Sequence, residues 1–219
     1  MQRRILRVFD NDGVLSDSLK ECYLATVGAH RHLNLHIPSL EIYRGCDSSE
    51  GFRGKKLALG VPEHKLKEYD ACWWDVYCKI LKENPPQMVP GAKEAIELLA
   101  SKGEHLALLT QAGEANTGLQ LGLAWVKSVF KDTMYVKDKA SALAEYKARM
   151  AEYNMIYFGD MLLDGAACLK ADVRFAVMVH KYSHTSEAQL LEFARVHSDM
   201  TTVVNSVTEF GRAAEIAFF

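Results

Sequence analysis

The chain has 219 residues, of which 49% are hydrophobic and 25% charged, enough for a core and compatible with one domain plus an insert. Its 26 Lys and Arg residues nearly balance 28 Asp and Glu residues, so the formal net charge of −2 suggests neither a nucleic acid nor a membrane surface as partner. No long apolar run follows Met1, so we expect no secretory signal and no spanning helix.

The cysteines indicate a reducing compartment. They are Cys22, Cys46, Cys72, Cys78 and Cys168. Their number is odd and they contain no Cys-x-x-Cys pair, which argues against a disulfide framework or a zinc site. We therefore expect free thiols and a cytoplasmic protein.

The first predicted strand ends on two acids. Residues 5–9 are mostly apolar and β-prone, which predicts a buried strand. Asp10, Asp12 and Gly13 follow, so both carboxylates lie at the carboxyl end of the strand, where open α/β sheets bind ligands. Two neighbouring carboxylates repel each other unless a cation lies between them or one is protonated. We interpret the pair as part of a divalent metal site.

Two other structures are compatible with an acidic motif of this kind. Clusters of Asp or Asn with Gly are often only turns, and a turn is the better interpretation of an isolated pair. An EF-hand calcium loop needs Asp first, Gly sixth and Glu twelfth. With Gly13 sixth, Val8 is first and Leu19 twelfth, so the loop does not fit.

The next part of the chain is predicted to be helical. We expect elements over residues 19–33, 40–43, 55–59 and 62–81. Pro85 and Pro86 end the last helix. Because no strand is predicted here, we assign residues 17–88 to an inserted helical cap domain, and residues 1–16 and 89–219 to the core domain.

From Pro90 onward, helices and strands alternate. The expected helices are residues 91–102, 114–123, 140–153 and 162–170. The expected strands are residues 105–110, 133–136, 155–160 and 173–177, and three segments complete the chain over 186–195, 201–204 and 207–217. Strands alternating with helices predict an α/β, Rossmann-like core with a doubly wound parallel sheet.

Further polar residues lie where these strands end or where the helix over 140–153 begins: Thr110, Gln111, Lys137, Lys139, Asp160 and Asp164. Each is a weak signal alone, because Thr at strand ends, Lys at helix starts and Gly-Asp turns are common. Together and in this order they indicate one shared site at the carboxyl edge of the sheet.

These motifs resemble the haloacid dehalogenase (HAD) superfamily, in the branch of phosphoglycolate phosphatases and β-phosphoglucomutases, which has a helical cap after the first motif. The resemblance covers essentially the whole chain. The first motif, Asp-x-Asp-Gly-Val-Leu at residues 10–15, is highly specific, and Gly-Asp-x-x-x-Asp at residues 159–164 is moderately so. The Thr and Lys motifs are weak alone and support the resemblance only through their positions relative to the two acidic motifs.

The resemblance implies a phosphoryl-transfer site. Asp10 would be the nucleophile that forms an aspartyl-phosphate, and Asp12 would act as general acid and then as general base. Mg²⁺ would be held by the Asp10 carboxylate, the Asp12 main-chain carbonyl and Asp160. Asp164 would orient the metal site through water.

Phosphate binding is assigned to the neighbouring strand end and a lysine. Thr110, Gln111 and nearby main-chain N–H groups would meet the phosphoryl oxygens. A lysine would neutralise charge on Asp10 and the phosphoryl group. We prefer Lys139, which leads directly into the following helix, and Lys137 is the alternative.

The cap is expected to close over the site and to supply much of the specificity. The cap residues best placed to meet an anionic group are Arg44, Arg53, Lys55 and Lys56. Taken singly, each is equally compatible with a solvated surface charge. We interpret Trp73 and Trp74 as cap core or a subunit contact, not as a cofactor platform. A cap of this size favours a small phosphorylated metabolite over a protein substrate.

The leading hypothesis is a Mg²⁺-dependent phosphatase that hydrolyses such a metabolite, of the phosphoglycolate or sugar-phosphate type, through an aspartyl-phosphate. The superfamily's dehalogenases lack the second Asp of the first motif, so Asp12 favours phosphoryl transfer. A phosphomutase resembling β-phosphoglucomutase stays possible, and the intact motifs argue against a non-catalytic relative. A phosphorelay receiver carries its phosphorylated Asp after a strand in the middle of the chain, whereas Asp10 follows the first strand, so the order of the motifs does not fit. Nucleoside monophosphates also remain open as substrates, and so does the choice between monomer and homodimer.

Overall fold

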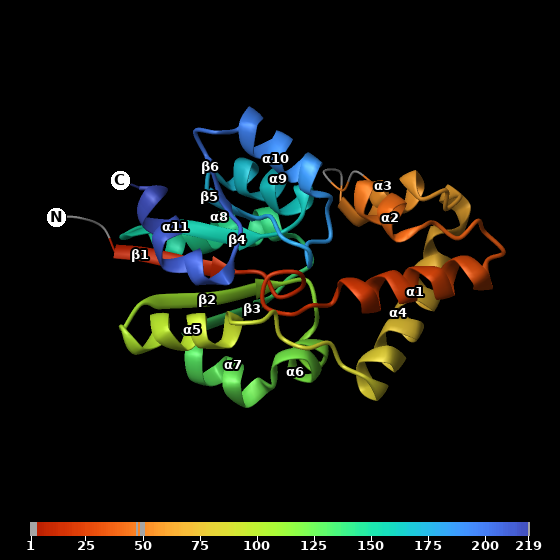
Figure 1. The fold of residues 1–219 in the computed structure, drawn as a ribbon, viewed down its shortest axis with the longest axis horizontal. Helices are drawn as coiled ribbons and strands as arrows, with labels where there is room; N and C mark the ends of the chain where they lie inside the picture. Colours follow the sequence, from red (N-terminus) through yellow and green to blue (C-terminus); the bar gives the residue numbers. More distant parts are fainter. Residues whose placement is uncertain (1–3, 47, 49–50, 219) are drawn as a thin grey trace.

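The computed structural model describes residues 4–46, 48 and 51–218 (Figure 1). In chain order the elements are β1 (Arg4–Phe9), α1 (Leu19–His32), α2 (Leu40–Gly45), α3 (Gly51–Ala58), η1 (Glu63–Lys65), α4 (Leu66–Glu83), α5 (Ala92–Ser101), β2 (His105–Thr110), α6 (Glu114–Leu121), α7 (Leu123–Val129), β3 (Asp132–Tyr135), α8 (Lys139–Arg149), β4 (Tyr153–Gly159), α9 (Leu162–Ala171), β5 (Arg174–Met178), α10 (Glu187–Val196), β6 (Thr201–Val204), η2 (Val207–Glu209) and α11 (Phe210–Ile216). Among these residues, no helix combines the length and apolar character needed to cross a membrane.

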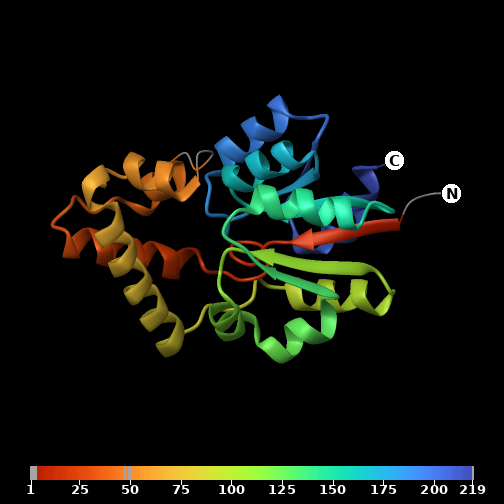
Figure 2. The same ribbon diagram turned by 180° about the vertical axis from the view of Figure 1, so that it is seen from behind.

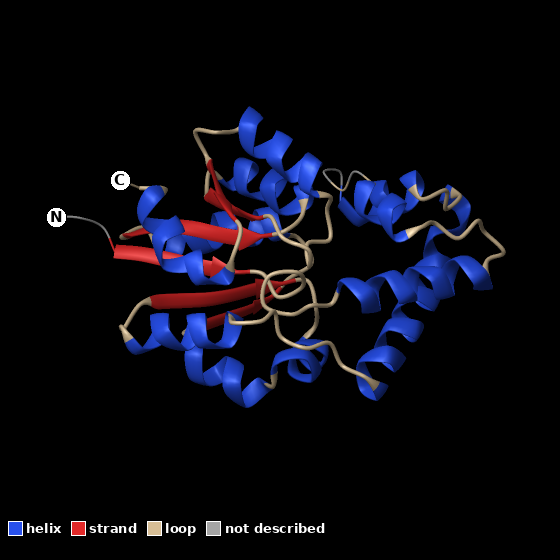
Figure 3. Ribbon diagram, in the orientation of Figure 1, coloured by secondary structure: helices blue, strands red, loops and turns tan. Residues whose placement is uncertain are grey.

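The strands form one parallel sheet in the order β3-β2-β1-β4-β5-β6, with helices on both faces (Figure 3). This confirms the predicted doubly wound α/β core. β1 lies at the centre, where Val8 is in register with Ala107 of β2 and Tyr157 of β4. In sheets of this order, ligands bind beyond the carboxyl ends of the strands at the point where the strand order reverses.

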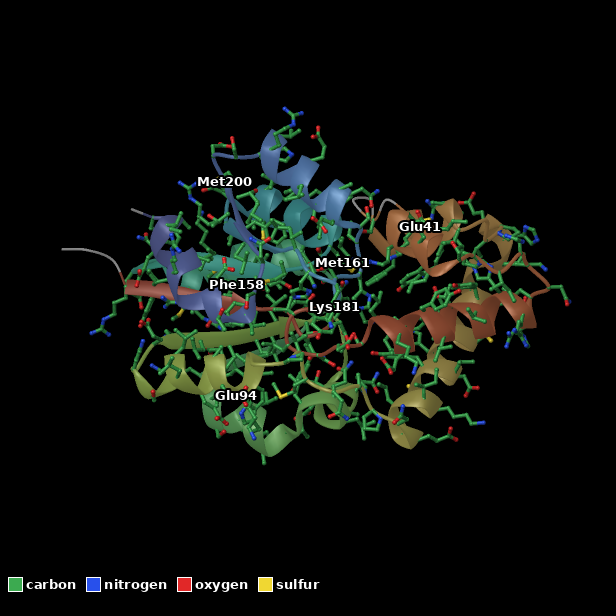
Figure 4. All side chains as sticks on the ribbon, in the orientation of Figure 1. Glu41, Glu94, Phe158, Met161, Lys181 and Met200 are labelled. Atoms are coloured by element: carbon green, nitrogen blue, oxygen red, sulfur yellow. The ribbon has the colours of Figure 1, made fainter. Side chains whose placement is uncertain are left out.

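β1 is buried on both faces because alternate side chains enter different cores. Leu6 and Val8 pack with residues of α8, α9 and α10, whereas Phe9 packs with residues of α5, α7 and α11. Phe9 stacks on Phe158 of β4 with ring centroids 4.7 Å apart, and Phe158 is labelled in Figure 4. This packing fixes the ends of β1 and β4 beside each other.

Helices α1 to α4 form an inserted cap beyond the carboxyl edge of the sheet, and both views show the heads of the strand arrows turned toward it (Figures 1 and 2). The cap has a core of its own, in which Ala25 of α1 packs with Tyr77 of α4. The segments leading into and out of the cap lie side by side, since Asp17 N–H donates to the Gln87 carbonyl at 2.9 Å. The cap is therefore attached to the core by two adjacent segments.

Most bounds shift by a few residues, α3 begins at residue 51 instead of 55, and two further differences concern α8 and α7. The helix predicted over 140–153 is shorter, because Tyr153 is in register with Arg4 and already belongs to β4. Residues 123–129 form α7, which was not predicted as a separate helix. Gly122, with φ +79°, interrupts the helical conformation and so separates α6 from α7.

Candidate active site

Three carboxylates converge where β1 and β4 end. Asp10 directly follows β1, Asp160 directly follows β4, and Asp164 lies in the first turn of α9. One oxygen from each lies within 4.8 Å of the others, and all three residues are buried. The structure thus brings Asp10 of the first predicted motif and both acids of the last motif into one cluster.

Gly13 permits the close approach of Asp160. Its φ is +70°, and a Cβ at this position would lie 2.1 Å from Asp160 Oδ2 and 2.9 Å from His184 Cδ2. A side chain there would collide with the acid and strain the backbone. The glycine of the first motif is therefore explained by the acid that packs against it.

Lys139 reaches the acidic cluster. Its Nζ lies 2.6 Å from Asp10 Oδ2 and 2.6 Å from Asp164 Oδ1, and its side chain is 5% exposed. Lys137, the alternative lysine, is exposed. Because a buried ammonium needs charged partners, two carboxylates at hydrogen-bond distance account for the position of Lys139.

The charges of the cluster are not balanced by Lys139 alone. Burial raises the pKa of Asp10 to about 7, against the lowering effect of Lys139. Burial, followed by repulsion from Asp164 and Asp10, raises the pKa of Asp160 well above its usual range. Both shifts follow from placing carboxylates close together away from water, and a cation between them would reverse the effect.

One oxygen of Asp160 is available to such a cation. Asp160 Oδ2 accepts a hydrogen bond from His184 N–H at 2.5 Å. Asp160 Oδ1 is buried and has no hydrogen-bond partner among the described residues. An unpartnered buried carboxylate oxygen is costly, so these residues fit an oxygen-ligated divalent cation.

Asp12 is held by a separate network that links core and cap. Gln120 Nε2 on α6 donates to Asp12 Oδ1 at 2.7 Å and to Tyr77 Oη on α4 at 2.9 Å. Tyr77 Oη donates to Asp12 Oδ1 at 3.4 Å. Asn11 Nδ2 donates to Gln120 Oε1, which fixes the orientation of the amide. Neither Gln120 nor Tyr77 is predicted from the sequence as a site residue, since their positions on two helices carry no local signal for this contact.

Thr110 and Gln111 lie beside the acids at the end of β2. Thr110 is buried, and its Oγ1 accepts a hydrogen bond from Ala112 N–H at 3.1 Å. Gln111 Nε2 donates to the main-chain carbonyl of Lys137 at 2.7 Å. Both residues line the same cavity as Asp10.

This cavity, of about 200 Å³, lies between the carboxyl edge of the sheet and the cap. Its core side includes Asp10, Asp12, Thr110 and Lys139, together with Met161, which Figure 4 places between the sheet and the cap. Its cap side is largely aromatic. A small molecule bound here would therefore meet the acidic cluster at one end and cap side chains at the other.

Two of the expected cap cations line the cavity. Lys56 forms an ion pair with Asp70. Lys55 is buried, its Nζ donates to the His184 carbonyl at 3.3 Å, and it lies 3.9 Å from the centroid of the Tyr43 ring. Burial lowers the pKa of Lys55 to about 8.

The two expected arginines are not among the residues that line the cavity. Arg53 is exposed and forms an ion pair with Glu63. Arg44 Nη2 donates to the Thr185 carbonyl at 3.5 Å and so connects the cap to a core loop. The structure therefore brings the predicted core residues together but only part of the predicted cap set.

No family model matches the chain, and no curated protein matches it in sequence. Solved structures are similar over nearly the whole chain. A predicted phosphatase from Clostridium acetobutylicum is 17% identical with a TM-score of 0.77, over 98% of this chain and 100% of the other. A predicted phosphoglycolate phosphatase from Haemophilus somnus 129PT is 20% identical with a TM-score of 0.68, over 97% and 98%. A putative β-phosphoglucomutase from Thermotoga maritima is 18% identical with a TM-score of 0.61, over 97% and 99%.

At these identities the similarity concerns the fold and not the reaction. Two further solved structures of the same kind, from Streptococcus pneumoniae and Agrobacterium tumefaciens, are described as haloacid dehalogenase-like. The six-stranded core, the strand order and the position of the inserted helices agree with the fold that the sequence motifs imply. The chain therefore has the fold of the haloacid dehalogenase-like hydrolases whose cap is helical.

Proposed function

We propose that the chain is a Mg²⁺-dependent phosphatase that hydrolyses a small phosphorylated metabolite through an aspartyl-phosphate on Asp10. The observation that carries the proposal is the buried cluster of Asp10, Asp160 and Asp164, with Lys139 at 2.6 Å from two of its carboxylates. Asp10 and Lys139 line a cavity of about 200 Å³, a size that suits a small molecule. Two of the similar solved structures are of predicted phosphatases, which agrees with this function.

Each of the core residues has a separate role in the proposed reaction. Asp10 attacks phosphorus, so that an oxygen–phosphorus bond to Asp10 forms while the bond to the leaving oxygen breaks. Asp12 gives a proton to the leaving oxygen and later takes one from the water that hydrolyses the intermediate. Thr110 and Lys139 bind the phosphoryl oxygens.

Mg²⁺ would be held by the carboxylates of Asp10 and Asp160 and by the main-chain carbonyl of Asp12. When bound, the ion offsets the repulsion between an anionic nucleophile and an anionic phosphoryl group. Asp164 positions the site: its Oδ2 accepts from the main-chain N–H groups of Asp160 and Met161 at 3.2 and 3.1 Å. It thereby fixes the turn that carries Asp160.

Removal of the metal should abolish the activity. We expect phosphate release from p-nitrophenyl phosphate in the presence of Mg²⁺, and a loss of about a hundredfold or more when EDTA is added, since a metal ion supplies several kcal/mol to such a reaction. Excess Mg²⁺ should restore the rate. Hydrolysis that continues unchanged after dialysis against EDTA would contradict the proposal.

Loss of the groups that hold Asp12 should affect substrates according to their leaving group. Gln120→Leu and Tyr77→Phe remove hydrogen bonds to Asp12 but leave the acidic cluster intact. We expect kcat/KM for an alkyl phosphate to fall about tenfold or more, because its leaving oxygen needs a proton from Asp12. The kcat/KM for p-nitrophenyl phosphate should change little, because nitrophenolate leaves without a proton and kcat/KM does not include the later hydrolysis of the aspartyl-phosphate.

The matched control for this comparison is Gln87→Leu, since Gln87 is exposed and lies outside the cavity. It should leave both rates unchanged. Equal losses with the alkyl and the nitrophenyl ester in the Gln120 and Tyr77 variants would show that these residues do not act through proton transfer.

A further inference from the structure

The cap wall of the cavity contains a row of aromatic rings that begins at Asp12. Tyr77, which donates to Asp12, stacks on Trp73 with ring centroids 4.7 Å apart. Trp74 meets Trp73 edge-on at 5.1 Å and Tyr77 at 5.9 Å. All three rings come from α4 and line the cavity. Trp73 packs with the cap core, as expected from the sequence, but both tryptophans are also part of the cavity wall.

Two rings of this wall are only partly covered by protein. Trp74 on α4 is 43% exposed and Phe52 on α3 is 44% exposed, although both line the cavity. Large apolar rings gathered at a concave surface indicate a place for an apolar or aromatic group of a ligand.

Two polar side chains of the same wall, Lys56 and Thr26, are engaged within the cap. Lys56 is paired with Asp70. Thr26 Oγ1 donates to the Cys22 carbonyl at 3.0 Å and accepts from Trp73 Nε1 at 3.1 Å. A glycolate carboxylate or the hydroxyls of a sugar would need free donors and acceptors here, because a buried polar group without a partner costs affinity.

Lys55 is held between the cap and the core by its own contacts. It is the cavity-lining cation of the cap that has no carboxylate partner among the described residues. Its Nζ already donates to the His184 carbonyl and lies over the Tyr43 ring. Its position connects the cap to the core loop that contacts Asp160, which is a positioning role.

We infer that the substrate is a phosphomonoester whose alcohol half carries an aromatic ring. The phosphoryl group would lie at Asp10, and the ring would pack against Trp74 and Phe52 at the other end of the cavity. This inference rests on the proposed phosphatase function and narrows its substrate class. A single six-membered ring on a short linker, as in benzyl phosphate, suits a cavity of about 200 Å³.

The test compares esters that leave as primary alkoxides, so that the chemistry of the leaving group is similar. We expect kcat/KM for benzyl phosphate to exceed that for ethyl phosphate about tenfold or more, from contact with two rings. It should also exceed kcat/KM for 2-phosphoglycolate and glucose 6-phosphate. The benzyl-to-ethyl ratio should fall about threefold or more in Trp74→Leu and in Phe52→Leu.

Trp125→Leu is the matched control, since Trp125 lies on α7 and does not line the cavity. It should keep the wild-type ratio. A second measurement needs no variant: benzylphosphonate should inhibit wild-type protein about tenfold more strongly than ethylphosphonate, because the ring contributes to binding without turnover.

Equal kcat/KM for benzyl and ethyl phosphate, or a preference for 2-phosphoglycolate or glucose 6-phosphate, would overturn the inference and leave the phosphatase proposal standing. Failure to release phosphate from any of these esters or from p-nitrophenyl phosphate would overturn both.

Discussion

Replacement of Asp10 with Asn should lower kcat for p-nitrophenyl phosphate by about 10⁴-fold or more, the scale seen when an enzyme's nucleophile is removed. The amide has nearly the same shape as the carboxylate, but its oxygen is a poor nucleophile and forms no aspartyl-phosphate. The substitution also removes one of the two carboxylates that lie 2.6 Å from Lys139 Nζ. Steady-state phosphate release by the purified variant measures the effect, and circular dichroism shows whether the fold persists.

Asp199→Asn is the matched control, because Asp199 is exposed and does not line the cavity. It should keep the wild-type rate. If Asp10→Asn kept a rate near that of wild type, Asp10 would not be the nucleophile.

Replacement of Lys139 with Met should lower kcat by about 10²- to 10³-fold, which is typical for the loss of one group that stabilises transition-state charge. Met keeps the length of the side chain but removes its charge. The variant should also be less stable by about 3–5 kcal/mol, since breaking a buried ion pair leaves uncompensated charge on Asp10 and Asp164. Kinetics at saturating substrate and urea unfolding at neutral pH measure the two effects separately.

The matched control is Lys137→Met. Lys137 is exposed, so neither its rate nor its free energy of unfolding should change appreciably. Should Lys137→Met cost more activity than Lys139→Met, the assignment of the two lysines would have to be exchanged.

The strands that carry the site could be predicted because they are buried apolar runs bounded by Gly and acidic residues. The expected strand over 105–110 coincides with β2. β1 and β4 differ from the expected ranges by one or two residues at their ends. With the strands placed, the parallel order brings their carboxyl ends together, and the acids that follow them become neighbours without further information.

The network that holds Asp12 could not be predicted, because it depends on how separate elements of core and cap pack. The contact between Asn11 and Gln120 joins residues 109 positions apart, and Tyr77 reaches Asp12 across the boundary between cap and core. Neither contact follows from helix periodicity, which shows that a face is apolar but not what lies opposite it.

The cap cations illustrate the same limit. Periodicity does not distinguish a charged side chain that lines a cavity from one that points to solvent. Arg53 is paired with Glu63 outside the cavity, while Lys55 is buried and lines the cavity. The difference depends on the partner that each side chain meets in the folded cap, and tertiary packing decides that partner.

A crystal structure of the protein grown with Mn²⁺ in place of Mg²⁺ would locate the ion through its anomalous scattering. We predict a single strong peak at the acidic cluster, with carboxylate oxygens of Asp10 and Asp160, including Asp160 Oδ1, at about 2.1 Å from the ion. If the cluster held no ion at a Mn²⁺ concentration that supports full activity, these acids would not form the metal site, and the proposed chemistry at Asp10 would lose its basis.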